Sequence, residues 1–248
     1  MSRLLTALFL VLCLVSLGLF IACGNGGNAQ VRMINAIDTS SNLSLDGYIN
    51  GTKYFTSVGT NQVYPAQTTP AAYVSVPSGS VTVQAYDAGT TTNPLFGSGV
   101  TTSLSGSSQY TLLLGGFLNT SPNAYLISDN NAVPASGDME VRIINGSALS
   151  AASNGISVAI YQSGEAPPSP QVTGLGLGQG SSYVAVPFEA GVQYFLDVYL
   201  SGSPNRLFTY NFTPGGSSTA GSISTFVIVD NTGGNSISSF PIYLQDLN

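Results

Sequence analysis

Apolar and polar residues alternate along much of the chain beyond its N-terminal segment. Residues 81–85 and 156–160 read V-T-V-Q-A and I-S-V-A-I, with an apolar residue at every second position. A period of two is typical of strands with one buried face. Continuous apolar runs at 112–114 and 226–229 indicate central strands. The pattern predicts an all-β fold, in which a single helical turn is expected only at 147–154.

Two segments of the first half recur in the second half. V-R-M-I-N-A at 31–36 is matched by V-R-I-I-N-G at 141–146, and Y-V-S-V-P at 73–77 by Y-V-A-V-P at 183–187. A repeat of this length is a domain rather than a solenoid unit, whose period is about 20–50 residues. Each copy shows about seven strands separated by Gly and Pro turns, which predicts two tandem immunoglobulin-like β-sandwiches.

The domain boundaries follow from this repeat. We expect the first β-sandwich at residues 30–133 and the second at 139–248, with a linker at 134–138. Because the linker is short, we expect the two sandwiches to touch end to end with little hinge freedom.

The N-terminus has the layout of an export signal. Arg3 precedes an apolar stretch from 4 to 21, as in a secretory signal peptide. The stretch ends in F-I-A-C at 20–23, which resembles a bacterial lipobox. This layout predicts a lipoprotein signal peptide at residues 1–22.

Cys23 is the predicted lipidation site. Acyl chains on Cys23 would hold the protein to a membrane through a flexible, Gly-rich tether at 23–29. The alternative is that Cys23 is a small apolar residue at the end of an uncleaved anchor. Gly24 stands where Asp would indicate retention in the inner membrane, so this resemblance implies export to the cell envelope and an outer-membrane location.

The composition excludes several functional classes. The 248 residues include five Lys and Arg against eleven Asp and Glu, a net charge of −6, and no His. A nucleic-acid-binding surface needs clustered cations, and His-based catalysis or a Ser-His-Asp triad needs an imidazole. Two Cys cannot form a four-cysteine zinc site. We therefore expect a protein that is not an enzyme, holds no cofactor and has no nucleic-acid partner.

Three motifs resemble a known family. L-D-G-Y-I-N-G-T at 45–52, the hairpin at 73–83 and Q-Y-T-L-L at 109–113 are similar to motifs of the bacterial domain-of-unknown-function family 4397. The resemblance implies tandem immunoglobulin-like domains on an exported protein. The family has no agreed activity, so no catalytic residue is implied. Asn35 stands where the family's opening motif has His, and the Pro-Asp-Ala-Pro loop of that motif is absent.

Acidic residues near the domain ends are candidate calcium ligands. Asp129, Asp138, Glu140 and Asp230 lie where loops of both copies would meet. Calcium is bound by six to eight oxygens, which such loops can supply. We favour the alternative that these residues form turns, because no D-x-D-x-D-G spacing is present. The Gly-rich segment 174–180 superficially resembles a phosphate-binding loop, but strand-like residues follow it, so we interpret it as a strand or bulge.

The leading hypothesis is a non-enzymatic, membrane-anchored envelope lipoprotein that presents two β-sandwiches for protein or glycan binding. The alternative is a self-associating structural component of the envelope, since few cations protect the sheet edges from pairing with other chains. Those cations are Arg32, Lys53, Arg142 and Arg206. The third hypothesis is a carboxylate-dependent hydrolase, in which two Asp or Glu side chains converge.

Overall fold

The computed structural model describes residues 27–66, 72–135, 137–214 and 221–247. The predicted signal peptide and Cys23 lie outside these residues. Within them, the regular structure is β-strand except for one short 3-10 helix, η1 (Leu149–Ser153). The all-β sandwich prediction is confirmed, and the helical turn lies where the pattern predicts it. No helix in the described ranges is long and apolar enough to cross a membrane.

The first nine strands form two sheets. One has the order β4-β1-β8-β9, with β5 also paired to β1, and the other has the order β3-β2-β6-β7. The strands are β1 (Ala29–Asp38), β2 (Leu45–Ile49), β3 (Thr52–Val58), β4 (Gln62–Tyr64), β5 (Val74–Val76), β6 (Gly79–Asp87), β7 (Val100–Leu104), β8 (Gln109–Phe117) and β9 (Asn123–Asp129).

The remaining strands form two further sheets, with the orders β13-β10-β16-β17 and β12-β11-β14-β15. Apart from β4, these orders repeat those of the first sandwich, and a parallel pair lies inside one sheet of each, β1 with β8 and β10 with β16. The strands are β10 (Asp138–Asn145), β11 (Ile156–Gln162), β12 (Val172–Leu175), β13 (Val184–Pro187), β14 (Tyr194–Leu200), β15 (Arg206–Phe212), β16 (Ile223–Ile228) and β17 (Ile242–Leu247).

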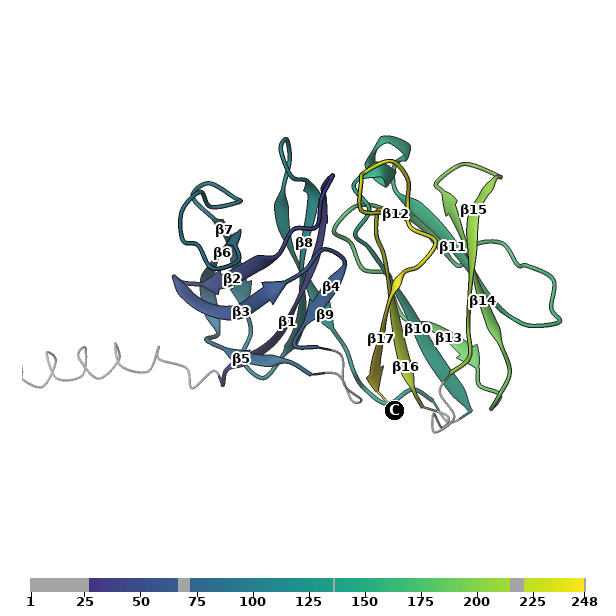
Figure 1. Cartoon of the computed structure of the whole chain (residues 1–248). Helices are drawn as coiled ribbons and strands as arrows, with labels where there is room; N and C mark the ends of the chain where they lie inside the picture. The colour runs from purple at the N-terminus through teal and green to yellow at the C-terminus, as the bar shows by residue number, and fades with distance from the viewer. Residues whose placement is uncertain (1–26, 67–71, 136, 215–220, 248) are drawn as a thin grey trace, which may run out of the picture.

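The sheets that contain β1 and β10 pack against each other, so the two sandwiches stand side by side (Figure 1). We call this contact the seam. Its buried cluster is separate from the core inside each sandwich. It consists of Ile34, Ala36, Leu113, Ile127, Ile144, Val227, Val229 and Leu244.

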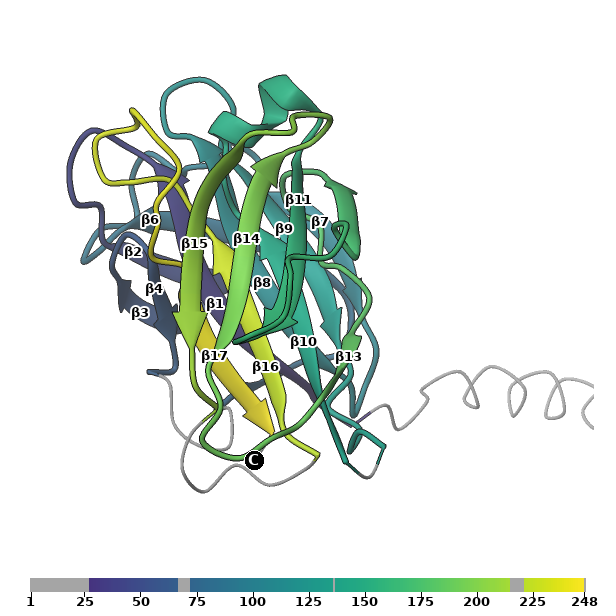
Figure 2. The same ribbon diagram turned by 90° about the vertical axis from the view of Figure 1, so that its right-hand side faces the viewer.

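The seam contradicts the expectation that the sandwiches touch end to end. Strand β1 is buried along almost its whole length, and β8 is buried at seven consecutive positions. A strand that is apolar on both faces needs an apolar layer on each side. The first sandwich supplies one layer to β1 and β8, and the second sandwich supplies the other (Figure 1). In Figure 2, turned by 90°, the strands of the second sandwich are drawn over those of the first.

The arginine of each repeated V-R-x-I-N segment faces the seam. Successive side chains of a strand point to opposite faces. Val31 and Met33 therefore enter the core of the first sandwich, whereas Arg32 and Ile34 face the second sandwich. Arg142 has the equivalent place on β10. Arg32 and Arg142 are only 1% and 3% exposed.

Each arginine pairs with a carboxylate of the other sandwich. Arg32 on β1 donates through both terminal nitrogens to Asp246 on β17. Arg142 on β10 donates to Asp129 on β9, with 2.6 Å between Nη1 and Oδ1. The two pairs cross the seam in opposite directions, and we call them the arginine lock.

Hydroxyl groups and aromatic rings complete the lock. Thr111 donates to Asp129, and Thr225 donates to Asp246 over 2.6 Å. The rings of Tyr73 and Tyr183 lie over the guanidinium groups of Arg32 and Arg142, with 5.3 and 5.1 Å from guanidinium carbon to ring centroid. Burial opposes the charge of Arg32, but the carboxylates of Asp246 and Asp129 outweigh burial and raise its pKa. The repeated Arg and Tyr residues are therefore interface residues.

The interpretation of Arg32 and Arg142 as cations that protect sheet edges is wrong, because both belong to the arginine lock. Arg32 and Arg142 lie on strands with a partner on either side. Only Lys53 and Arg206 lie on edge strands, β3 and β15, and each pairs with a buried carboxylate of its own sheet, Lys53 with Asp46 and Arg206 with Asp197.

We expect Arg32→Met to lower the free energy of unfolding by about 3–5 kcal/mol, because it leaves the buried carboxylate of Asp246 without its cation. Urea unfolding at pH 7 measures this loss. The double variant Arg32→Met with Asp246→Leu removes both charges and is expected to recover part of the stability. A single variant as stable as the wild type would contradict the energetic role of the lock.

Candidate functional site

The seam ends in an acidic and an aromatic side chain. Along β1, the face that carries Ile34 and Ala36 continues to Asp38, the last residue of the strand. On the parallel strand β8, the corresponding face continues from Leu113 to Phe117. Asp38 and Phe117 are register partners, so they lie side by side where the apolar contact between the sandwiches ends.

A loop of the second sandwich approaches these two residues. The backbone N–H of Gly233, between β16 and β17, donates to the carbonyl of Thr39 over 2.9 Å. A Cβ atom on Gly234 would lie 2.7 Å from Oδ1 of Asp38, so only a residue without a side chain fits here without a shift. On the other side, Asn61 donates to the backbone oxygen of Asp230. The loop is therefore held against the first sandwich at several points.

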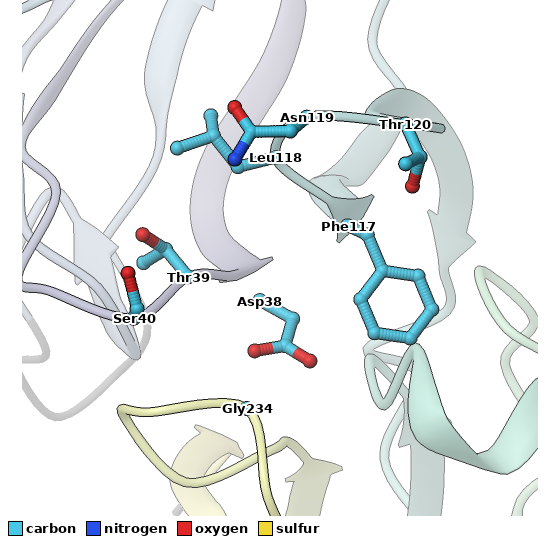
Figure 3. A pocket seen from close by; sticks show the side chains of 8 residues that line it. All are labelled: Asp38, Thr39, Ser40, Phe117, Leu118, Asn119, Thr120 and Gly234. Atoms are coloured by element: carbon cyan, nitrogen blue, oxygen red, sulfur yellow. The ribbon is translucent and has the colours of Figure 1, made fainter.

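Together these segments enclose a pocket of about 270 Å³ at the rim of the seam (Figure 3), which we call the seam pocket. In this view the Asp38 carboxylate lies between the Phe117 ring and Gly234. Phe117 is 37% exposed. Hydroxyl and amide groups surround these residues. The lining consists of Asp38, Thr39, Ser40, Phe117, Leu118, Asn119, Thr120 and Gly234.

The electrostatics of the pocket are dominated by Asp38. Its side chain is 6% exposed in the folded protein, and Oδ2 is buried without a hydrogen-bond partner among the described residues. Burial raises the pKa of Asp38, and no cation of the described residues offsets this effect. Burial also raises the pKa of Asp230, where hydrogen bonds from Ser147 and Leu149 act in the opposite direction and the charge of Asp38 adds to the rise. None of the ion pairs among the described residues involves Asp38 or Asp230.

The four candidate calcium ligands occupy different environments. Asp129 is part of the arginine lock, and Asp230 accepts hydrogen bonds from Ser147 and Leu149. Asp138 and Glu140 lie on β10, and burial raises the pKa of Glu140.

No group of three or more His, Cys, Asp or Glu residues in the described ranges is arranged to hold a metal ion. The geometry therefore gives the calcium hypothesis no support.

The Gly-rich segment 174–180 has a structural part in the seam. A Cβ atom on Gly178 would lie 2.1 Å from the ring of Tyr125, and one on Gly180 would lie 2.9 Å from Arg142. Because Gly178 and Gly180 have no side chains, Tyr125 on β9 and Arg142 can lie close to the loop. The segment begins with the last two residues of β12, whose pairing with β11 contains a register shift, and continues as a turn to an isolated bridge between Gly180 and Ile144.

Asp38 and Phe117 are absent from the candidates that the sequence suggested. A signal was present for both, since each continues the period-two face of a strand that is otherwise apolar at Ile34, Ala36 and Leu113. The alternation alone does not tell which face of a doubly buried strand meets a second domain.

A family model described as Domain of unknown function (DUF4397) matches residues 29–154, which run from β1 to the C-terminal end of η1 and include Asp38 and Phe117. No curated protein matches the chain. Among solved structures, the chain is similar to one titled "Alpha-glucan recognition by family 41 carbohydrate-binding modules from streptococcal virulence factors". That similarity has 14% identity and a TM-score of 0.26, over 80% of this chain and 92% of that one.

We expect Asp38→Asn to raise the melting temperature at pH 7. The raised pKa means that folded Asp38 holds its proton more tightly than unfolded Asp38, so ionisation above the ordinary pKa of 3.8 destabilises the fold. The gain is expected to vanish below that pH, where Asp38 is protonated in both states. Thermal unfolding from pH 3 to 8 measures it, with Asp87→Asn, at an exposed position, as the control. A variant less stable than the wild type at pH 7 would mean that Asp38 is stabilised by partners in the fold.

Proposed function

The chain belongs to the family described as Domain of unknown function (DUF4397), and on that premise we propose that it is a non-enzymatic envelope lipoprotein that binds a saccharide at the seam pocket. The observation that carries this proposal is the pairing of a buried carboxylate, whose Oδ2 has no partner in the described structure, with a partly exposed phenyl ring. Asp38 and Phe117 stand on adjacent strands whose positions the seam fixes.

A sugar ring matches the two residues in complementary ways. Its hydroxyl groups are hydrogen-bond donors, which a carboxylate such as Asp38 accepts. Its C–H face is apolar and can pack on the ring of Phe117. Ser40, Asn119 and Thr120 add exposed hydroxyl and amide groups at the rim for the outward-facing hydroxyls. A volume of about 270 Å³ suits a single sugar unit rather than a large cofactor.

The lining favours binding over hydrolysis. Glycoside hydrolysis uses two carboxyl groups that flank the scissile bond. Asp38 is the one carboxylate in the lining of the pocket. The neighbouring Asp230 is outside that lining, and both of its oxygens accept hydrogen bonds, from Ser147 and Leu149. We therefore propose a binding protein rather than the carboxylate-dependent hydrolase.

The direction of β1 fits a protein that presents its pocket away from an anchored end. The strand begins at Ala29, six residues after Cys23, and ends at Asp38 in the pocket. At a rise of about 3.3 Å per residue, the two ends are about 30 Å apart. A lipid anchor at Cys23 would thus hold one end of β1 near the membrane and leave the pocket toward the surroundings.

We expect Phe117→Ala to weaken saccharide binding at least about tenfold, because the apolar platform is lost. A glycan array identifies the bound saccharide, and calorimetric titration measures its affinity for each variant. Phe240→Ala is the matched control, since Phe240 is 77% exposed and outside the pocket. Binding only to envelope proteins on a parallel array, or a saccharide affinity that Phe117→Ala leaves unchanged, would contradict the proposal.

For the anchor, we expect Cys23→Ala to abolish incorporation of a labelled fatty acid into the protein, because the acyl-accepting thiol is lost. The labelled protein is detected on a gel after growth with an alkyne-bearing fatty acid. Cys13→Ala, within the predicted signal peptide, serves as the control and is expected to keep the label. Labelled protein in the Cys23→Ala strain would refute lipidation at this residue.

A further inference from the structure

We propose that the saccharide bound in the seam pocket carries a free, positively charged amino group, and that Asp38 binds this ammonium. The ligand class is a hexosamine whose amine is not acetylated. The inference rests on the proposed function of saccharide binding and specifies the sugar that the pocket selects.

The charge balance of the protein favours a cationic ligand at Asp38. Every Lys and Arg in the described ranges already pairs with an acid other than Asp38 and Asp230. These pairs are Arg32 with Asp246 and Asp129, Lys53 with Asp46, Arg142 with Asp129 and Arg206 with Asp197. Asp38 and Asp230 therefore have no cation of the described chain to offset their charge, and a cationic ligand would supply one.

The burial of Asp38 favours the same kind of ligand. A buried charge is costly unless it is paired and hydrogen-bonded, and Oδ2 of Asp38 is buried without a partner. A neutral hydroxyl donates one hydrogen bond but leaves the charge in place. An ammonium group neutralises the charge and offers three donors, and hydrogen bonds between charged groups are roughly twice as strong as neutral ones. The nearby charge of Asp230 attracts the same cation.

A metal ion fits the surroundings of Asp38 and Asp230 poorly. Calcium takes six to eight oxygen ligands. Asp230 is the nearest further acid, but Ser147 and Leu149 already donate to its two oxygens. The described ranges also contain no group of three or more metal-ligating side chains. An organic cation needs fewer oxygens and accepts an aromatic neighbour, since an ammonium is attracted to the face of a ring such as that of Phe117.

The rim of the pocket favours an amino sugar over the lysine side chain of a protein. Exposed Ser40, Asn119 and Thr120 offer hydrogen-bonding groups around Asp38 and Phe117. A sugar ring carries hydroxyl groups that can use them, together with its amine. The alkyl stem of a lysine has no polar group to bind there. Acetylation of the sugar amine removes the charge and adds bulk at the position that would face Asp38.

The test compares three ligands by calorimetric titration of the full-length protein in detergent. They are a β-1,4-linked glucosamine tetramer, its fully N-acetylated counterpart and a short lysine-rich peptide. The proteins are the wild type, Asp38→Asn, and Asp87→Asn, which removes the same charge at an exposed position of β6 outside the pocket. Asp38→Asn is nearly isosteric, and its thermal unfolding shows whether it is folded under the conditions of the titration.

We expect the wild type to bind the glucosamine tetramer at least about tenfold more tightly than the acetylated tetramer. Asp38→Asn is expected to lose this preference, while Asp87→Asn keeps it, which separates pocket binding from general attraction of a polycation to an acidic protein. Retention of the preference in Asp38→Asn would overturn the inference, as would equal binding of the lysine-rich peptide.

Two outcomes distinguish this inference from the proposed function. Equal affinity of the wild type for both tetramers, lowered in both cases by Phe117→Ala, overturns selection for the amine and leaves saccharide binding at the pocket intact. Failure of both tetramers to bind overturns the inference, and if the glycan array also yields no ligand, the proposed function fails with it.

Discussion

Two buried ion pairs that cross between the sandwiches are the constraint on which the arrangement of the molecule depends. The carboxylate that pairs with Arg142 comes from the first sandwich, and the one that accepts both terminal nitrogens of Arg32 comes from the second. Loss of one partner while the seam stays closed would leave the other charge buried and unpaired, which is strongly unfavourable. Apolar packing at the seam is non-directional, whereas these hydrogen bonds are directional. The lock therefore sets the register in which two otherwise similar apolar faces meet.

The lock is nearly symmetric, and the pocket arises where the symmetry ends. The repeated segments place Arg, Asn and Tyr at equivalent positions of both copies, and each arginine pairs with an acid across the seam and lies against the ring of a repeated Tyr. At the far end of the same strands, Asp38 of the first copy corresponds by position to Ala148 of the second. At this position of the repeat, the first copy thus carries a carboxylate where the second carries a methyl group. The Gly233–Gly234 turn of the second sandwich has no side chain to cover that carboxylate.

Strand β1 connects the features that bear on function. Its first residues follow the predicted lipid anchor, Arg32 holds the second sandwich, and Asp38 lies in the pocket. The parallel pair with β8 and the docked loop after β16 hold the buried carboxylate of Asp38 in place, although burial raises its pKa. Residues that bind ligands often reduce stability in this way, and the surrounding contacts compensate for the loss.

The sequence by itself predicted the all-β sandwich fold and showed a repeated segment, because a period of two and recurring motifs are local properties of the chain. The repeated segments include Arg32, Arg142, Tyr73 and Tyr183, but the sequence did not show which residues these four contact. Tertiary structure alone decided that the sandwiches meet through β1 and β10, because a strand that is apolar on both faces does not specify which layer covers which face. It also decided the pocket, since Asp38 and Gly234 are far apart in the sequence and are joined only by the packing of the seam.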